Sequence, residues 1–388
     1  MQKKHLYEID LMRTFIMLGV LSVHSVSVYL SQLEDWTPSF ITIATIHSSM
    51  HFTRMAFMFI TGVVLFITYY RREFHTLKFW KKRLLLIAIP YVFFNIIYVL
   101  FGHGLYNGSL LSFFKHLLHA LVSGDEFYIY YVLVSFQFYI VFPALLYALR
   151  KFERWHVPIF IGSFIFQLLL MGFYKFILPP LDTSHWPYLL QLFAGHYGVF
   201  VLTYECWFIA GGIFACHYEK IVAFITSHAR ALYVTLGTSV LIMWAHYFFN
   251  RIVLHETDHK AEMVEQPIFV PYSFIIIAVM LYLGLRWAQR RTEPNMKTFS
   301  RFVALASQCS FGMFLVQPFA LFLLKMMVPK LEGTLFFISI PFGILFVYFL
   351  SMLIAYCLNR IPLLSYCVGR KSKLFQRKYK ESPAVKNT

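Results

Sequence analysis

The chain has 388 residues, of which 59% are hydrophobic, 20% are aromatic and only 13% are charged. Long apolar segments recur along it, and this composition predicts an all-α polytopic membrane protein rather than a soluble domain. The formal net charge of +16 could indicate a nucleic-acid partner. The basic residues are concentrated in alternate connecting segments, however, which is typical of membrane topology and argues against nucleic-acid binding.

Ten transmembrane helices are expected, each of about 20 residues. In chain order they are 11–33, 47–70, 84–101, 127–149, 157–176, 198–217, 231–249, 268–286, 302–325 and 335–357. They form one membrane domain, residues 1–358, followed by a basic tail, residues 359–388, that we expect to be cytoplasmic and disordered. The first span is not expected to be a cleaved signal peptide, because it is long, contains His24 and lacks a clear small-residue cleavage site.

Lys and Arg residues are distributed unequally between alternate connecting segments. Of the 34 in the chain, 27 fall on one side of the predicted membrane, including clusters at 71–83 and 286–301 and in the tail. The other seven are Arg54, Lys115, Lys175, Arg251, Lys260, Lys325 and Lys330. Cytoplasmic segments carry the excess of basic residues, so both termini are predicted to be cytoplasmic (N-in and C-in). The tail is also expected to contact anionic membrane lipid.

Two polar side chains in the first predicted span, Arg13 and His24, are eleven residues apart. At about 100° per residue this separation is within about 20° of three full turns, so both lie on one helix face, about 16 Å apart along the axis. Such groups are costly in lipid and therefore face the protein interior, commonly for a function. The alternative is that Arg13 snorkels to the membrane surface and that His24 is a hydrogen-bonded core residue.

Five polar residues are expected at a similar depth, in the outer half of the membrane. His24 and Gln317 lie on helices that enter from the cytoplasm, whereas Arg54, Gln137 and Glu205 lie on helices that enter from outside. A base, a cation and a carboxylate in one buried layer suit acid–base chemistry. Alternatively, the two glutamines hydrogen-bond neighbouring helices, and Arg54 and Glu205 neutralise each other.

Three outer connecting segments are long enough to contact a ligand. Residues 102–126 contain the amphipathic stretch LLSFFKHLLHALV, which suits the membrane interface. Residues 177–197 are rich in Pro, Trp, His and Tyr, which suits either sugar stacking or an interfacial aromatic belt, and residues 250–267 are acidic. The five cysteines form no CxxC pair, so neither disulfides nor zinc are indicated and no metal is expected.

Five short motifs follow one another along the membrane domain. They are Arg13 with His24 after ten intervening residues, FMFITG at Phe57–Gly62, KKRLLLIAIPY at Lys81–Tyr91, QFYIVFP at Gln137–Pro143 and SFGMFLVQP at Ser310–Pro318. In this order they resemble the acyltransferase 3 family of integral membrane acyltransferases. The chain is similar to the stand-alone form of the family, including members of the intercellular-adhesion type that are encoded with bacterial surface polysaccharide systems.

Two positions depart from the family pattern. Many relatives have His where this chain has Gln317, and many have His near the start of the fourth span, where this chain has Tyr128. The resemblance therefore supplies no second catalytic histidine at either position. Gln317, Tyr128 and Gln137 are expected to contact the acceptor substrate instead.

The resemblance implies transfer of an acyl group, commonly acetyl, from a cytoplasmic coenzyme A thioester such as acetyl-CoA to a glycan hydroxyl outside the bacterial plasma membrane. His24 would take the hydroxyl proton or carry the acyl group itself. Arg13, Lys82 and Arg83 would bind the polyanionic coenzyme A. The positive-inside rule alone could account for Lys82 and Arg83.

On the acceptor side, Arg54 would orient the sugar or stabilise the oxyanion, and Glu205 would position His24 or bind a sugar hydroxyl. The expected partners are a surface glycan or lipid-linked sugar, and polysaccharide synthesis proteins. Two other functions fit ten spans with a polar interior: a transporter that exports a glycan or lipid-linked sugar, and a structural subunit of a polysaccharide synthase. The second of these leaves the buried charges without a role.

Overall fold

The structure is a computed structural model that describes residues 5–102 and 110–369. Its regular elements are helices, with no strand among these residues, which confirms the all-α prediction. The α-helices are α1 (Tyr7–Leu30), α2 (Pro38–Ser48), α3 (Thr53–Tyr69), α4 (Thr76–Gly102), α5 (Leu110–Ser123), α6 (Tyr130–Lys151), α7 (His156–Gly172), α8 (Tyr188–Gly195), α9 (Glu205–Cys216), α10 (Tyr218–Ser227), α11 (Ala229–Phe248), α12 (Asp258–Ala261), α13 (Phe269–Arg290), α14 (Lys297–Met327), α15 (Gly333–Arg360) and α16 (Leu364–Cys367). Most of the predicted basic tail lies outside the described residues.

In the described part of the chain, nine segments are long and apolar enough to cross a membrane, and the number is ten if the bent pair α9 and α10 is one span. This confirms a polytopic membrane protein. The cytoplasmic location of both termini stays a prediction from the basic residues. The amphipathic stretch in the predicted outer segment 102–126 forms α5, a short apolar helix of 14 residues.

The second span differs most from its prediction. It runs from Pro38 to Tyr69 instead of 47–70, as two helices, α2 and α3, separated at residues 49–52. α2 begins early because the Thr37 side chain accepts a hydrogen bond from the amide of Phe40 (3.3 Å) and Pro38 occupies the first turn. The predicted start at residue 47 therefore falls near the end of α2, just before the break inside the span. Such irregular backbone is tolerated at membrane depth where it lines a protein interior.

The predicted sixth span is also interrupted. α9 and α10 meet at an angle of 97°. The turn falls at His217, whose backbone angles, φ −114° and ψ 26°, are outside the helical range. The predicted span 198–217 therefore covers the first helical segment of the pair, Val201–Cys216, and ends at the bend. It does not predict the bend itself or the second segment, α10.

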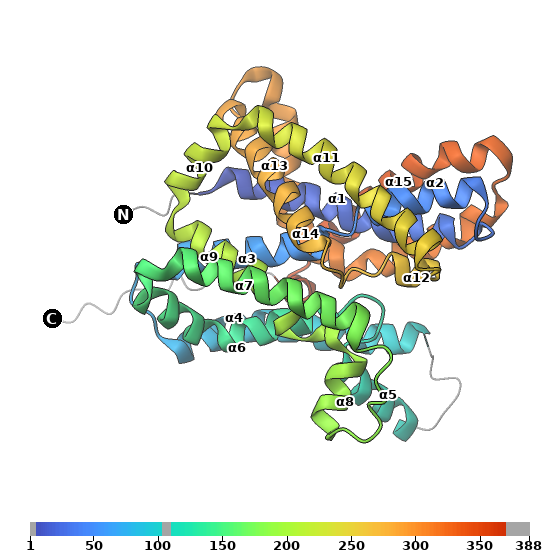
Figure 1. The fold of residues 1–388 in the computed structure, drawn as a ribbon, viewed down its shortest axis with the longest axis horizontal. Helices are drawn as coiled ribbons and strands as arrows, with labels where there is room; N and C mark the ends of the chain where they lie inside the picture. The colour runs from blue at the N-terminus through green and yellow to red at the C-terminus, as the bar shows by residue number, and fades with distance from the viewer. Residues whose placement is uncertain (1–4, 103–109, 370–388) are drawn as a thin grey trace.

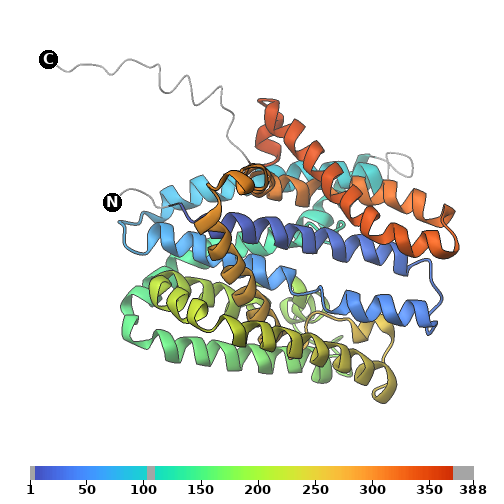
Figure 2. The ribbon, with the colours of Figure 1, turned by 90° about the horizontal axis from the view of Figure 1, so that it is seen from above.

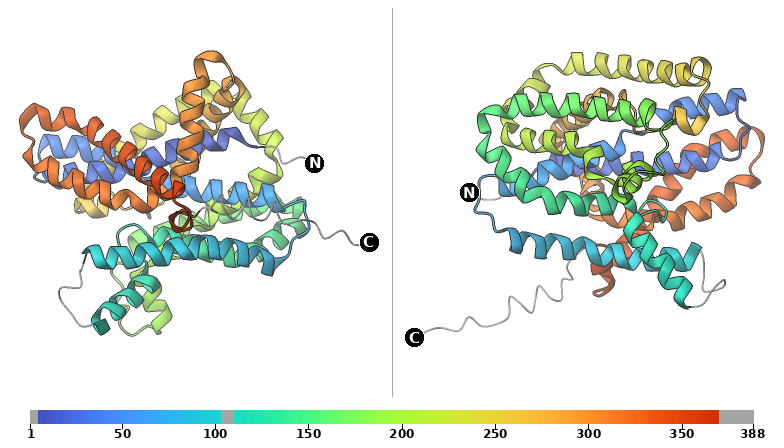
Figure 3. Two further views of the ribbon diagram at one scale, coloured as in Figure 1. Left: turned by 180° about the vertical axis from the view of Figure 1, so that it is seen from behind. Right: turned by 60° about the horizontal axis from the view of Figure 1, so that its bottom comes forward.

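Helix α1 lies in the middle of the bundle. It packs against α2, α3, α13, α14 and α15. Figure 2 shows α1 (dark blue) crossing the centre, with α15 (red) to one side and α11 (yellow) to the other. Helices α14 and α15 pack closely side by side, as both panels of Figure 3 show. The central position of α1 explains how side chains along one of its faces can line internal cavities.

Helices α3 and α9 approach each other closely at two glycines. A Cβ atom added to Gly62 would lie 2.3 Å from the carbonyl oxygen of Phe208, and one added to Gly211 would lie 2.2 Å from that of Phe59. Small residues permit such backbone contact between membrane helices. Gly62 ends the FMFITG motif, so this motif contributes a packing surface. The contact fixes the position of α3, which lies beside α9 in Figure 1. Arg54 lies in the first turn of α3.

Candidate active site

A small internal chamber surrounds His24, and we call it the histidine chamber. Its volume is about 40 Å³, which is room for a few water molecules or a chemical group of that size. Its polar walls come from α1, the break between α2 and α3, and the start of α6. The lining residues are Val20, Val23, His24, His51, Thr53, Arg54, Phe57, Tyr128, Tyr130, Tyr131 and Phe314. The structure therefore brings together three residues that the sequence analysis selected: His24, Arg54 and Tyr128.

Tyr128 holds the imidazole of His24 by stacking. The two ring centroids are 3.6 Å apart and the ring planes differ by 24°. Tyr128 lies in the turn that leads into α6. An aromatic pair in this geometry restricts ring orientation and contributes about 0.5–1.5 kcal/mol beyond its buried area. Tyr128 therefore fixes the plane in which His24 presents its nitrogens.

Arg54 enters the chamber from the first turn of α3. Its guanidinium forms an ion pair with Glu265 (3.2 Å) and lies over the ring of Tyr130, 5.3 Å from the centroid. The hydroxyl of Tyr131 donates a hydrogen bond to the backbone carbonyl of Arg54 (3.3 Å). These contacts hold a fixed cation beside His24 in a partly dehydrated site, where its field is weakly screened.

The alternative in which Arg54 and Glu205 neutralise each other is not what the structure shows, because the ion-pair partner of Arg54 is Glu265. Glu205 begins α9 and faces α7, where both of its carboxylate oxygens accept hydrogen bonds from Ser163 (2.9 Å). Glu205 is also outside the lining of the histidine chamber. The sequence predicted a depth for Glu205, but depth does not specify which way a helix face points.

The two predicted glutamines have different surroundings. Gln137 donates a hydrogen bond to the carbonyl of Val199 (2.7 Å) and accepts one from the amide of Val201 (2.9 Å). It thus holds the irregular segment before α9, which is the structural alternative considered for it. Gln317 is fully buried, and its side-chain amide makes no hydrogen bond among the described residues. Neither side chain lines the histidine chamber.

A larger cavity, here called the basic cavity, lies toward the N-terminal end of α1. Its volume is about 480 Å³, and its lining includes Arg13 and Arg83 together with Asp10, Ser307 and Tyr139. Arg13 and Arg83, which the sequence analysis grouped as donor-binding residues, therefore line the same cavity. Lys82 is exposed and is not part of the lining.

Three aromatic side chains belong to both cavities: Phe57, Tyr131 and Phe314. The ring of Tyr131 lies between the other two, 6.2 Å from Phe57 and 6.0 Å from Phe314 between centroids. The basic cavity and the histidine chamber therefore adjoin at these three residues. The helix face predicted from the spacing of Arg13 and His24 runs along both cavities.

The sequence analysis did not select His51, Glu265 or the tyrosines Tyr130 and Tyr131. Glu265 was noted only as part of an acidic outer segment, and the tyrosines looked like ordinary aromatic residues. The Glu265 side chain is buried, and burial of Tyr197 and, secondarily, the Glu265 carboxylate raise the pKa of Tyr197 above its ordinary value. The signal available for His51 was its spacing of four from His47, which places two imidazoles near each other on a helical or turn segment.

A second, still larger cavity of about 830 Å³ lies between the end of α3 and the start of α10. It is lined in part by Arg71, Arg72, Cys216 and Lys220. It shares no lining residue with the histidine chamber. It therefore offers anion binding without direct access to His24.

The fold and these cavities define a multi-pass membrane protein with an internal histidine and arginine site beside a basic cavity. A model of the acyltransferase domain of the acyltransferase 3 family matches residues 6–360. The chain therefore belongs to the acyltransferase 3 family, as its five motifs predicted, and it is a membrane acyltransferase in general terms. No curated protein and no solved structure matches it.

Proposed function

We propose that this protein is a membrane O-acyltransferase that transfers an acyl group, in the first instance acetyl, from cytoplasmic acyl-coenzyme A to a hydroxyl of an extracytoplasmic glycan. The observation that supports this most is the common wall of the two cavities. A basic cavity suited to a polyanionic donor and a chamber containing a base share Phe57, Tyr131 and Phe314. This arrangement suits a reaction whose two substrates approach from opposite sides of a membrane.

On the donor side, Arg13 and Arg83 would bind phosphate groups of coenzyme A in the basic cavity. Arginine suits this role because its planar guanidinium binds phosphate oxygens in pairs. The thioester would then extend along α1, over the roughly 16 Å that separate Arg13 from His24 along the helix axis. Lys82 is exposed, so it would act only at the mouth of the basic cavity, where its positive charge would attract the anionic donor.

On the acceptor side, a neutral His24 would accept the proton of the sugar hydroxyl as its oxygen attacks the thioester carbonyl. The carbon–sulfur bond then breaks, the proton passes to the leaving thiolate, and the products are the ester and free coenzyme A. If His24 instead carries the acyl group, a carbon–nitrogen bond to the imidazole forms as the carbon–sulfur bond breaks, and the sugar oxygen then displaces the imidazole as the ester forms. The imidazole takes up the hydroxyl proton, and the released thiolate is protonated to free coenzyme A. Arg54 would stabilise the negative charge that develops on the carbonyl oxygen.

The test uses the purified full chain in nanodiscs with acetyl-CoA that is radiolabelled in the acetyl group. We expect release of coenzyme A that depends on an added glycan acceptor, with label recovered in the glycan as an ester. His24→Gln should abolish this transfer at equal protein level, because Gln forms hydrogen bonds but accepts no proton at neutral pH. Transport of unmodified glycan without coenzyme A release would support the exporter and contradict the proposal.

A further inference from the structure

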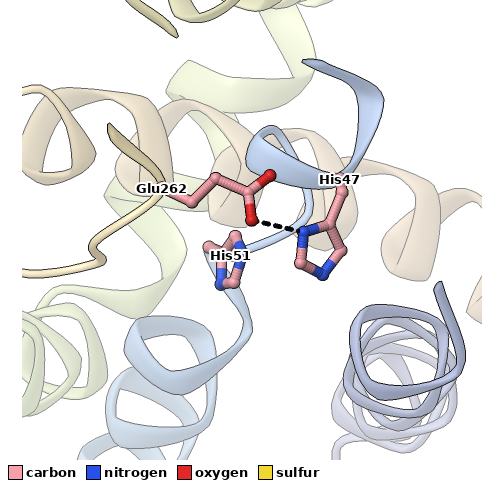
Figure 4. Close-up of side chains that lie close together, drawn as sticks. All are labelled: His47, His51 and Glu262. Carbon is pink, nitrogen blue, oxygen red and sulfur yellow. Dashed lines mark hydrogen bonds and ion pairs between the residues drawn. The ribbon is translucent and has the colours of Figure 1, made fainter. Parts of the chain in front are cut away.

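A second cluster of polar side chains lies beside the histidine chamber: His47, His51 and Glu262. Figure 4 shows the three side chains converging, with His47 from the end of α2, His51 from the break before α3 and Glu262 from the segment after α12. One potential ligand atom from each residue lies within 4.8 Å of the others. The closest pair is Nδ1 of His47 and Oε2 of Glu262, at 2.8 Å.

The hydrogen bonds of His47 determine which of its nitrogens is available. Its Nε2 lies 3.0 Å from the carbonyl oxygen of Val23 and 3.1 Å from the hydroxyl of Ser27. A carbonyl oxygen only accepts, so Nε2 carries the proton and donates it. In the neutral imidazole, Nδ1 then presents a lone pair toward the carboxylate of Glu262. Two acceptors at 2.8 Å must share a proton, and a metal ion that takes the place of this proton would be bound by both.

Two further polar atoms of the cluster have no hydrogen-bond partner among the described residues. Nε2 of His51 and Oε1 of Glu262 are both inaccessible to solvent and make no hydrogen bond to the described residues. A buried polar atom without a partner costs about 1–3 kcal/mol. A bound metal ion would occupy the same space and satisfy these atoms by coordination, directly or through a bound water.

We propose that His47, His51 and Glu262 bind a divalent transition-metal ion, with zinc favoured by the two imidazoles and one carboxylate. Three atoms within 4.8 Å of one another leave a central ion at most about 2.8 Å from each, so movements below about 1 Å reach zinc–ligand distances. The bond from His47 to the Val23 carbonyl is the outer-shell partner that a metal-binding histidine usually has.

The ion would join two segments that are distant in the chain. It would fix the break between α2 and α3, from which Arg54 follows, to the acidic segment that supplies Glu265. Binding would displace the proton shared by His47 and Glu262 into solvent, so the cluster would gain one net positive charge. This inference concerns metal binding alone and holds or fails independently of acyl transfer.

The experiment measures zinc in the full chain, purified in detergent without a polyhistidine tag and treated with a chelator before zinc is added back. We expect elemental mass spectrometry to find about one zinc ion per chain. When cobalt replaces zinc, we expect visible d–d absorption. Zinc should also raise the Tm of the wild-type protein, because it binds the folded state. His51→Ala and Glu262→Gln should each lose bound zinc and the cobalt spectrum.

The matched control is His246→Gln, which alters a partly buried histidine on α11 outside the cluster and should leave zinc binding unchanged. If a cluster variant does not fold, the wild-type titration still decides the question. Wild-type protein that binds no zinc above the level of a protein-free nanodisc or micelle overturns the proposal, and the cluster is then an ordinary hydrogen-bonded pair beside an unpaired histidine. Zinc that persists in folded Glu262→Gln and His51→Ala overturns it as well.

Discussion

The imidazole of His24 lies flat against the ring of Tyr128, with centroids 3.6 Å apart. His24 comes from the middle of α1 and Tyr128 from the turn before α6, so the contact depends on the packing of distant segments. Relatives with a histidine at the position of Tyr128 would place a second imidazole here. In this chain the same position provides an aromatic surface that fixes the orientation of His24.

The first prediction concerns this stacking. Tyr128→Phe keeps the aromatic ring and should retain at least half of the acyl-transfer activity. Tyr128→Leu removes the stacking and should lower kcat by roughly threefold to tenfold, which corresponds to the 0.5–1.5 kcal/mol of an aromatic pair. The measurement is glycan-dependent release of coenzyme A at equal protein level. Equal loss in both variants would instead indicate that the hydroxyl matters, and would contradict a purely orienting role.

The second prediction concerns Arg13 in the basic cavity. Arg13→Lys keeps the charge but loses the planar pair of donors, so affinity for acetyl-CoA should fall on the order of tenfold. The readout is the KM for acetyl-CoA, with kcat changed less. Lys82→Gln is the comparison, because Lys82 is exposed and outside the cavity lining, and it should change KM less. A folded Arg13→Ala protein with wild-type donor affinity and turnover would rule out this role.

The third prediction concerns the ion pair of Arg54 and Glu265. Arg54→Gln leaves the largely buried carboxylate unpaired and should lower stability on the order of 2 kcal/mol, less than for a fully buried pair because the Arg54 side chain is 31% exposed. Adding Glu265→Gln should restore most of the Tm. Acyl transfer should stay lost in the double variant, since the cation at the chamber is still absent. Recovery of activity together with stability would show that Arg54 has a structural role only.

The fourth prediction concerns the contact of α3 with α9. Gly62→Ala should lower the free energy of unfolding by about 1–3 kcal/mol or more, because its Cβ would overlap the carbonyl of Phe208. The Tm or the yield of folded protein should fall accordingly. The control is Gly237→Ala on α11, where an added Cβ meets no atom within 4 Å. Thermal unfolding followed by size-exclusion chromatography in detergent measures both. Similar Tm values for the two variants would contradict the close packing.

The fifth prediction concerns topology. Reporter proteins fused after Thr388 and inserted near Glu293 should both lie in the cytoplasm, because the neighbouring segments are basic. A reporter near Asp258 should lie outside. A cytoplasmic signal from the insertion near Asp258 would invert the proposed donor and acceptor sides of the two cavities.

Local sequence was sufficient for the number of apolar segments and for the face shared by Arg13 and His24. Both depend on helical periodicity and on the cost of polar groups in lipid, which act within a single segment. The bend at His217 and the break at residues 49–52 were missed, because a polar residue in an apolar run is compatible with an intact helix, a break or an end.

Tertiary structure decided which polar groups meet. Arg54 pairs with Glu265, 211 residues later, and His47 with Glu262, 215 residues later, while Glu205 turns toward Ser163. An approximate position along a span was predictable for each residue from the sequence. The direction in which each side chain points was not, because it depends on how the helices pack around α1 and on where the acidic segment folds back between them.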